Sequence, residues 1–156
     1  MERQRETDDT HRLELLPHQM KFLKSQKREV LLSGAFGAGK TRSIVLKCAM
    51  RASIQGAREG LCRKTFVALK RSTLKTLLEP DGLLPPILPR GSYEYKKIDG
   101  EILIHGGGSI MLFGLEDASR IGSMNLSGVA VDECVELNEQ DWTMLRGRIR
   151  LKLPNL

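Results

Sequence analysis

The 156-residue sequence predicts an α/β fold, with a mainly parallel sheet, helices around it and a small antiparallel insertion. Short apolar runs, the size of buried strands, alternate with stretches of helical period near both ends of the chain. Asp99-Gly100, a dipeptide typical of tight hairpins, separates two short runs with strand character. A glycine-rich stretch at residues 34–39 lies between a predicted strand and a predicted helix.

The N-terminal half is expected to alternate between helices and strands after a mobile arm. Residues 1–12 mix charges without apolar periodicity, so we expect an arm there and a single partial domain at 13–156. Pro17 favours a helix start, because the first helical turn needs no donor at that position. The other predicted elements are a buried strand at 29–32, an amphipathic helix at 40–55, a strand at 60–63 and a helix at 66–78.

The C-terminal half begins with a change of period. Three strands are predicted at 93–97, 101–105 and 109–113, and they form the antiparallel insertion. An apolar run at 128–131 predicts another buried strand, and residues 138–146 show a last helical pattern. Strands and helices therefore flank the insertion on both sides.

Composition excludes several classes of protein. The chain is 40% hydrophobic and 28% charged, as ordinary globular proteins are. No apolar run reaches the roughly 18 residues of a membrane-spanning helix, and the charged first residues do not resemble a secretory signal. Cys48, Cys62 and Cys134 are too far apart for a zinc-binding pattern, so we expect a reducing, cytoplasmic location. The net charge of +6 is compatible with a polyanionic partner.

Residues 34–41 match the pattern G-x-x-x-x-G-K-[ST] at every fixed position. Glycines allow successive backbone N–H groups to point at one anion, and the helix that follows adds its positive N-terminal end. The lysine would reach the β- and γ-phosphates of a nucleotide, and the threonine hydroxyl would bind Mg²⁺. The alternative is a glycine-rich turn with an exposed lysine. The predicted phosphate loop consists of Gly34, Ala35, Phe36, Gly37, Ala38, Gly39, Lys40 and Thr41.

Asp132 and Glu133 follow the predicted strand at 128–131. A carboxylate at the end of a buried strand is well placed to hold Mg²⁺, so Asp132 is a candidate metal-binding residue. The adjacent Glu133 could polarise an attacking water molecule, as a general base does. The alternative is that the acidic pair caps the next helix or faces solvent.

Gln19 precedes the loop on the first predicted helix. A glutamine amide can pair with the N6/N7 edge of adenine through two hydrogen bonds. The alternative is an ordinary exposed glutamine. Basic residues on the helix at 66–78, among them Arg71 and Lys75, could contact phosphates or simply be solvated.

With these motifs in place, the sequence resembles the N-terminal ATPase region of bacteriophage terminase large subunits. The resemblance extends from about residue 16 to residue 153. The adenine motif of that family is similar to residues 16–22, and its Walker A and Walker B motifs are similar to residues 33–41 and 129–133. The other matching stretches are residues 62–66, 69–73, 119–122 and 141–148.

The resemblance implies a P-loop ATPase of the additional-strand, RecA-like class, which hydrolyses ATP to ADP and phosphate. Gln19 would then bind the adenine of ATP, and the phosphate loop, Asp132 and Glu133 would act on its phosphates and Mg²⁺. In rings of such ATPases one subunit supplies an arginine to the site of its neighbour, and Arg120 is the nearest match here.

The resemblance also implies partners. These are double-stranded DNA, further copies of the chain in a ring, the small terminase subunit and the portal, with no membrane involved. The resemblance implies that they assemble in the cytoplasm of the host cell.

The family's ATPase region continues into a coupling motif and a nuclease domain, whereas this sequence ends at Leu156. We therefore expect a core that is incomplete at its C-terminus. In the additional-strand class, one further strand lies between the Walker A and Walker B strands, here residues 29–32 and 128–131. Without it, backbone groups of both neighbours lose partners, so we expect residues 1–156 alone to be poorly stable and nearly inactive.

Two other functions stay open. A helicase-like or recombination ATPase would use the same scaffold, and unwinding of a duplex would indicate it. A catalytically silent nucleotide-binding or assembly module is the other, and nucleotide binding without turnover would indicate that one.

Overall fold

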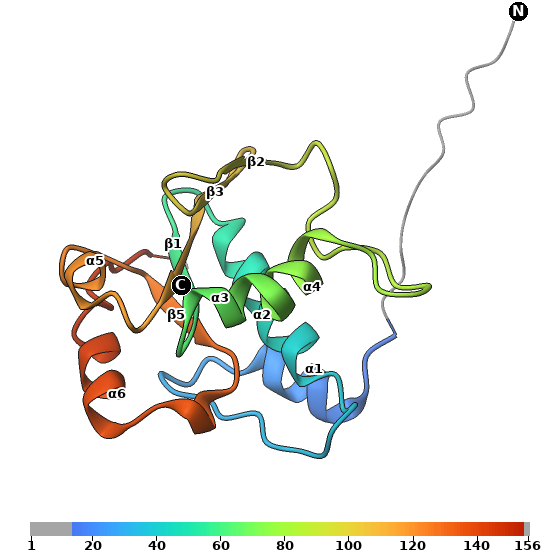
Figure 1. Ribbon diagram of the computed structural model, residues 1–156. Helices are drawn as coiled ribbons and strands as arrows, with labels where there is room; N and C mark the ends of the chain where they lie inside the picture. Colours follow the sequence, from blue (N-terminus) through green and yellow to red (C-terminus); the bar gives the residue numbers. More distant parts are fainter. Residues whose placement is uncertain (1–13, 155–156) are drawn as a thin grey trace, which may run out of the picture.

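A five-stranded mixed sheet organises the chain (Figure 1). The computed structural model describes residues 14–154, so the arm expected at 1–12 lies outside the described residues. The strands are β1 (Arg58–Arg63), β2 (Tyr93–Lys96), β3 (Glu101–Ile104), β4 (Ser109–Gly114) and β5 (Gly128–Val131), in the order β2-β3-β4-β1-β5. β1 pairs in parallel with β4 and β5, whereas β2, β3 and β4 pair antiparallel. The α/β class and the strands predicted from residue 60 onward are therefore confirmed.

The antiparallel insertion is not a separate sheet. Its last strand, β4, pairs antiparallel with β3 on one side and parallel with β1 on the other. The hairpin that was expected around Asp99-Gly100 therefore extends the parallel sheet at one edge. β5 lies at the opposite edge.

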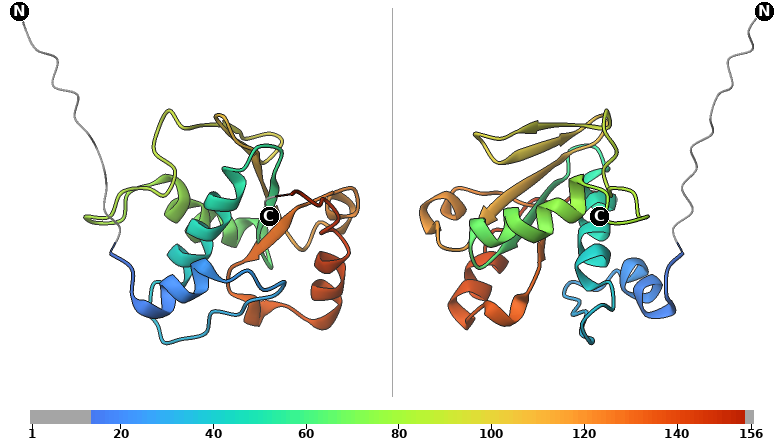
Figure 2. Two further views of the ribbon diagram at one scale, coloured as in Figure 1. Left: turned by 180° about the vertical axis from the view of Figure 1, so that it is seen from behind. Right: turned by 45° about the vertical axis from the view of Figure 1, so that its right-hand side comes forward.

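Helices cover both faces of the sheet (Figure 2). Neighbouring strand residues point to opposite faces, so Leu61 packs with α2 while Cys62 packs with α6. Phe22 of α1 is also buried. The helices are α1 (Pro17–Lys24), α2 (Lys40–Ala52), α3 (Phe66–Ala68), α4 (Leu74–Leu78), α5 (Ala118–Gly122) and α6 (Glu139–Arg146), with a π-helical turn η1 (Leu69–Thr73) and a 3₁₀ turn η2 (Cys134–Glu136).

The buried strand predicted at 29–32 is wrong. These residues form no strand, and Leu31 is 72% exposed. A strand is stable only when a neighbour accepts and donates its backbone hydrogen bonds. Within residues 14–154, β5 pairs with β1 alone, and no strand lies beside 29–32. After α6, the backbone of residues 148–151 hydrogen-bonds to Leu126, just before β5, and Arg146 at the end of α6 forms an ion pair with Glu29 at 2.8 Å.

The helix predicted at 66–78 is present but interrupted. Its middle turn is π-helical, and the N–H of Leu74 donates to the carbonyl of Leu69, five residues earlier. A π turn inserts one extra residue into a helix and is frequent at functional sites. The turn changes which side chains face the sheet.

The start of α6 is fixed by a reciprocal cap. Asn138 accepts from the N–H of Asp141, and Asp141 accepts from the N–H of Asn138. Lys64, just after β1, donates to the same aspartate at 2.6 Å. The hydrogen bond from Lys64 holds the pKa of Asp141 below its ordinary value of 3.8.

Replacing Asp141 by asparagine should lower the free energy of unfolding at pH 7 by about 1 kcal/mol, because a charged pair between a buried aspartate and a partly exposed lysine is lost. Folding lowers the pKa of Asp141, so its contribution is complete above pH 3.8 and is lost as the pH falls through the folded pKa. Urea unfolding should therefore show a difference between wild type and Asp141→Asn that shrinks at acidic pH. Glu139→Gln, in the same helical turn, is the control, and an equal loss in both variants would contradict the assignment.

Within residues 14–154, the longest helices are too short and too polar to cross a lipid bilayer.

Candidate functional site

The predicted phosphate loop lies directly before α2. Gly37 and Gly39 have φ values of 76° and 69°, in the left-handed region that side chains other than glycine rarely adopt. Gly39 is the N-cap of α2 and offers no side-chain cap to its first turn. The free N–H groups of that turn therefore face the loop, as an anion-binding site requires.

Lys40 lies across the loop. Its Nζ donates to the carbonyls of Gly34 and Ala35, both at 2.8 Å. The same ammonium lies 5.9 Å from the centre of the exposed Phe36 ring. A phosphate group bound by the loop would offer this ammonium stronger, charged acceptors in place of the two carbonyls.

Thr41 and Asp132 are 91 residues apart in sequence and meet in the structure. The Thr41 hydroxyl donates to Oδ1 of Asp132 at 3.0 Å. Asp132 follows β5 and is only 3% exposed. Hydroxyl and carboxylate oxygens are the ligands that Mg²⁺ prefers, so this pair fits a cation carried by a nucleotide. Within residues 14–154, no group of three or more His, Cys, Asp and Glu side chains is arranged to hold a metal on its own.

Glu133 has an unusual backbone. Its φ and ψ are 52° and 50°, and it is the only residue other than glycine with positive φ among those that the structure describes. Such a conformation costs about 1–3 kcal/mol and is concentrated at functional sites. The N–H of Glu133 donates to Asp132, while its carboxylate is exposed. With this left-handed backbone, the Asp132 side chain is buried while the Glu133 side chain next to it is exposed to solvent.

Gln19 fastens α1 to the loop. Its Nε2 donates to the carbonyl of Ala38 at 3.1 Å, and its Oε1 accepts from the N–H of Leu16 at 3.0 Å. A Cβ added at Gly39 would lie 2.5 Å from that Nε2. Gln19 is therefore buried beside the loop, with both ends of its amide engaged.

Arg120 lies elsewhere. It belongs to α5, and its guanidinium donates to the carbonyl of Asp99 in the turn between β2 and β3. Its backbone N–H donates to Asp117 and its carbonyl accepts from Ser123, both within or next to α5. The structure does not bring it to the loop or to Asp132.

Thr73 is the residue that the sequence analysis missed. It is fully buried, and its hydroxyl donates to Oδ2 of Asp132 at 2.6 Å. Leu69 and Leu77, four residues to either side, are also fully buried. A hydroxyl in the middle of an apolar helix stripe is the signal that could have identified it.

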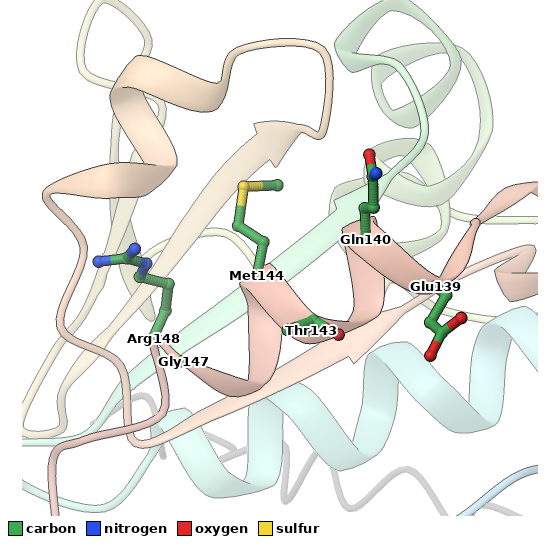
Figure 3. A pocket seen from close by; sticks show the side chains of 6 residues that line it. All are labelled: Glu139, Gln140, Thr143, Met144, Gly147 and Arg148. Atoms are coloured by element: carbon green, nitrogen blue, oxygen red, sulfur yellow. The ribbon is translucent and has the colours of Figure 1, made fainter.

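Other features take no part in this site. Burial raises the pKa of the Cys48 and Cys62 thiols, so neither is a nucleophile at neutral pH. A shallow hollow along α6 is lined by residues that were not predicted as site residues (Figure 3). Gln140 and Met144, one helical turn apart, project from the same side of the helix there. The residues that line this hollow include none of the phosphate loop, and they do not include Asp132 or Glu133.

Comparison with known proteins identifies a family and a similar fold. A family model described as phage terminase large subunit matches residues 25–156. The large terminase of the thermophilic bacteriophage D6E is similar in structure, with a TM-score of 0.68 and 23% identity over 86% of this chain and 36% of that one. A structure of the same D6E protein in complex with ADP has a TM-score of 0.61 and 20% identity, with the same coverage. The chain thus spans 36% of the length of these structures. Among curated proteins, none is significantly similar to the chain.

Proposed function

The chain belongs to the phage terminase large subunit family, and from this premise we propose that it is the ATP-binding and ATP-hydrolysing module of a viral DNA-packaging motor. The observation that supports this most directly is the 3.0 Å hydrogen bond between Thr41 and Asp132. It unites the phosphate loop with the end of a neighbouring strand, as a P-loop site requires. The ADP complex of the D6E terminase adds support for nucleotide binding.

The proposed core is of the additional-strand, RecA-like P-loop class. The parallel strands β4, β1 and β5 and the helix that follows the loop are consistent with it. In such a core the phosphate loop lies at the end of the sheet where the parallel strands have their carboxyl termini. Asp132 and Glu133 directly follow β5 and so lie at that end of the sheet.

Each residue of the site has a proposed task. The loop N–H groups and Lys40 bind the phosphates of ATP, and Thr41 and Asp132 hold Mg²⁺. Mg²⁺ bound with the nucleotide neutralises charge on the phosphate oxygens. Glu133 holds the attacking water and takes its proton.

Gln19 and Arg120 have weaker support. The Gln19 amide already donates to the carbonyl of Ala38 in the loop. To bind adenine, the amide would have to give up one of its present hydrogen bonds for one with the base. Arg120 could act only on the site of a neighbouring subunit in a ring, because its hydrogen bonds within this chain are outside the site.

The proposed macromolecular partners follow from the family. They are double-stranded DNA, further copies of the chain in a ring, the small terminase subunit and the portal, in the cytoplasm of the infected cell. Lys70, Arg71 and Lys75 are exposed on one helix and are suitable for phosphate contacts. The surplus of positive charge, +6, agrees with a polyanionic partner.

Nucleotide binding tests this proposal. In thermal unfolding of the 156-residue chain, ADP with Mg²⁺ should raise the unfolding midpoint, since ADP at 100 times its Kd stabilises the folded state by about 2.7 kcal/mol. The same ADP concentration with EDTA should give a smaller shift. The absence of any shift with ADP and ATP, each with Mg²⁺, would contradict the proposal. ATP turnover stimulated by double-stranded DNA without strand separation would distinguish a packaging motor from a helicase.

A further inference from the structure

Asp132 receives two hydroxyl hydrogen bonds, one on each carboxylate oxygen. Thr41 of the phosphate loop donates to Oδ1 at 3.0 Å, and Thr73 donates to Oδ2 at 2.6 Å. The Thr73 side chain is fully buried and Asp132 is 3% exposed, so water has little access to Oδ2. The Thr73 contact is thus the shorter of the two and the more deeply enclosed.

Thr73 differs from the other hydroxyl residues of its helix. A hydroxyl inside a helix usually donates to the carbonyl four residues earlier. Ser72 does this with Ala68, and Thr76 does it with Ser72. Thr73 instead donates across to Asp132, 59 residues away in sequence.

Thr73 lies in the π-helical turn, whereas Thr76 lies after it. The carbonyl four residues before Thr73 belongs to Leu69, and it accepts from the N–H of Leu74. Thr73 is the last residue of this turn, whose extra residue rotates the following part of the helix. Leu69, Thr73 and Leu77 all remain on the buried face. The turn therefore presents a hydroxyl to the carboxylate without exposing the apolar side chains beside it.

Arg63 holds the same turn in place. Its guanidinium donates to Ser72 at 2.9 Å and to Glu136 at 2.8 Å. Ser72 belongs to the π turn, and Glu136 belongs to η2, the turn that follows Glu133. Arg63 thereby links the π turn that carries Thr73 to η2, the turn that follows Asp132 and Glu133.

We propose that Thr73 is a positioning residue that fixes the rotation of the Asp132 carboxylate, so that Oδ1 stays directed at Thr41 and at the cation that a nucleotide carries. This inference rests on the proposed nucleotide-binding function. Without the hydroxyl, a buried Oδ2 has no donor and the carboxylate is held only from one side. Groups that hydrogen-bond to metal-binding carboxylates affect metal affinity about 10–100-fold.

Thr73→Val tests the role, because valine keeps the shape of threonine and removes the donor. Thr73→Ser keeps the donor, and Thr73→Ala is a second variant without a hydroxyl. Thr76→Val, the same change in the next turn of the helix, is the matched control, since Thr76 donates to Ser72 and not to Asp132. The measurement is the Mg²⁺ concentration at which a fluorescent ADP analogue binds half-maximally, together with its affinity in EDTA and the thermal unfolding midpoint.

We expect Thr73→Val and Thr73→Ala to need about tenfold more Mg²⁺ than wild type, with unchanged affinity in EDTA. Thr73→Ser and Thr76→Val should need the same Mg²⁺ concentration as wild type. An unchanged Mg²⁺ requirement in Thr73→Val would overturn the inference, as would a lower unfolding midpoint with equal loss of binding in Mg²⁺ and in EDTA. If either result is seen while the wild type binds the analogue with Mg²⁺, only the role of Thr73 is overturned and the proposed nucleotide binding stands. If the wild type itself never binds the analogue, the proposed function and the role of Thr73 are both overturned.

Discussion

Glu133→Gln should reduce ATP turnover by a factor of about 10²–10⁴ while leaving nucleotide affinity unchanged. Glutamine has the same shape but cannot take a proton from water at neutral pH. The exposed position of Glu133, directed away from the buried Asp132, leaves its carboxylate accessible to a water molecule at the γ-phosphate. Both side chains carry the same penalty in the left-handed region, so the fold should be unaffected.

The measurement is steady-state ATP hydrolysis by the complete protein, with the downstream sequence restored, in the presence of double-stranded DNA, together with equilibrium binding of ATP. Glu94→Gln is the control, because Glu94 is exposed on β2 at the opposite edge of the sheet from β5. If Glu133→Gln turns ATP over at the wild-type rate, Glu133 is not the residue that activates water.

Lys40→Ala should weaken binding of ATP and ADP by about 100-fold. The substitution removes the ammonium that is expected to pair with the β- and γ-phosphates, and a charge-assisted hydrogen bond contributes about 1.5–3 kcal/mol. The lysine's present acceptors, the carbonyls of Gly34 and Ala35, belong to an exposed loop and can be solvated when it is removed. Folding should therefore be little changed.

Titration of a fluorescent ADP analogue with Mg²⁺ measures this effect. Lys24→Ala removes the same charge from the exposed end of α1 and should bind as wild type does. Equal affinity of wild type and Lys40→Ala would mean that the loop does not bind phosphate through this lysine.

Local sequence patterns predicted most of the fold but failed at one strand. β1, the hairpin strands and β5 were predictable because these short runs of strand character are bounded by turn residues. Residues 29–32 show the same kind of run, yet they form no strand. The pattern of apolar residues shows which residues favour burial, but a strand also needs a neighbouring strand to complete its backbone hydrogen bonds. The apolar run at 29–32 carries no information about whether such a neighbouring strand exists.

The candidate site shows a similar division. The phosphate loop and the acidic pair have short motifs, and the structure shows a 3.0 Å hydrogen bond from Thr41 of the loop to Asp132 of the pair. Thr73 lies in a stretch that matches the family, residues 69–73, but no motif gave it a role, because its contact with Asp132 depends on how this helix packs beside the end of β5. The use of the Gln19 amide to hold Ala38 was equally hidden, since it depends on where α1 packs.

The left-handed backbone of Glu133 has a consequence for laboratory evolution. Glycine adopts these angles without the steric cost that a glutamate carries, and asparagine does so at a reduced cost. A library selected only for heat resistance would therefore enrich glycine and asparagine at position 133, and each of these replacements deletes the carboxylate. Thermal stability and the proposed catalytic carboxylate therefore place opposite demands on position 133. A search for thermostable variants should keep glutamate at this position.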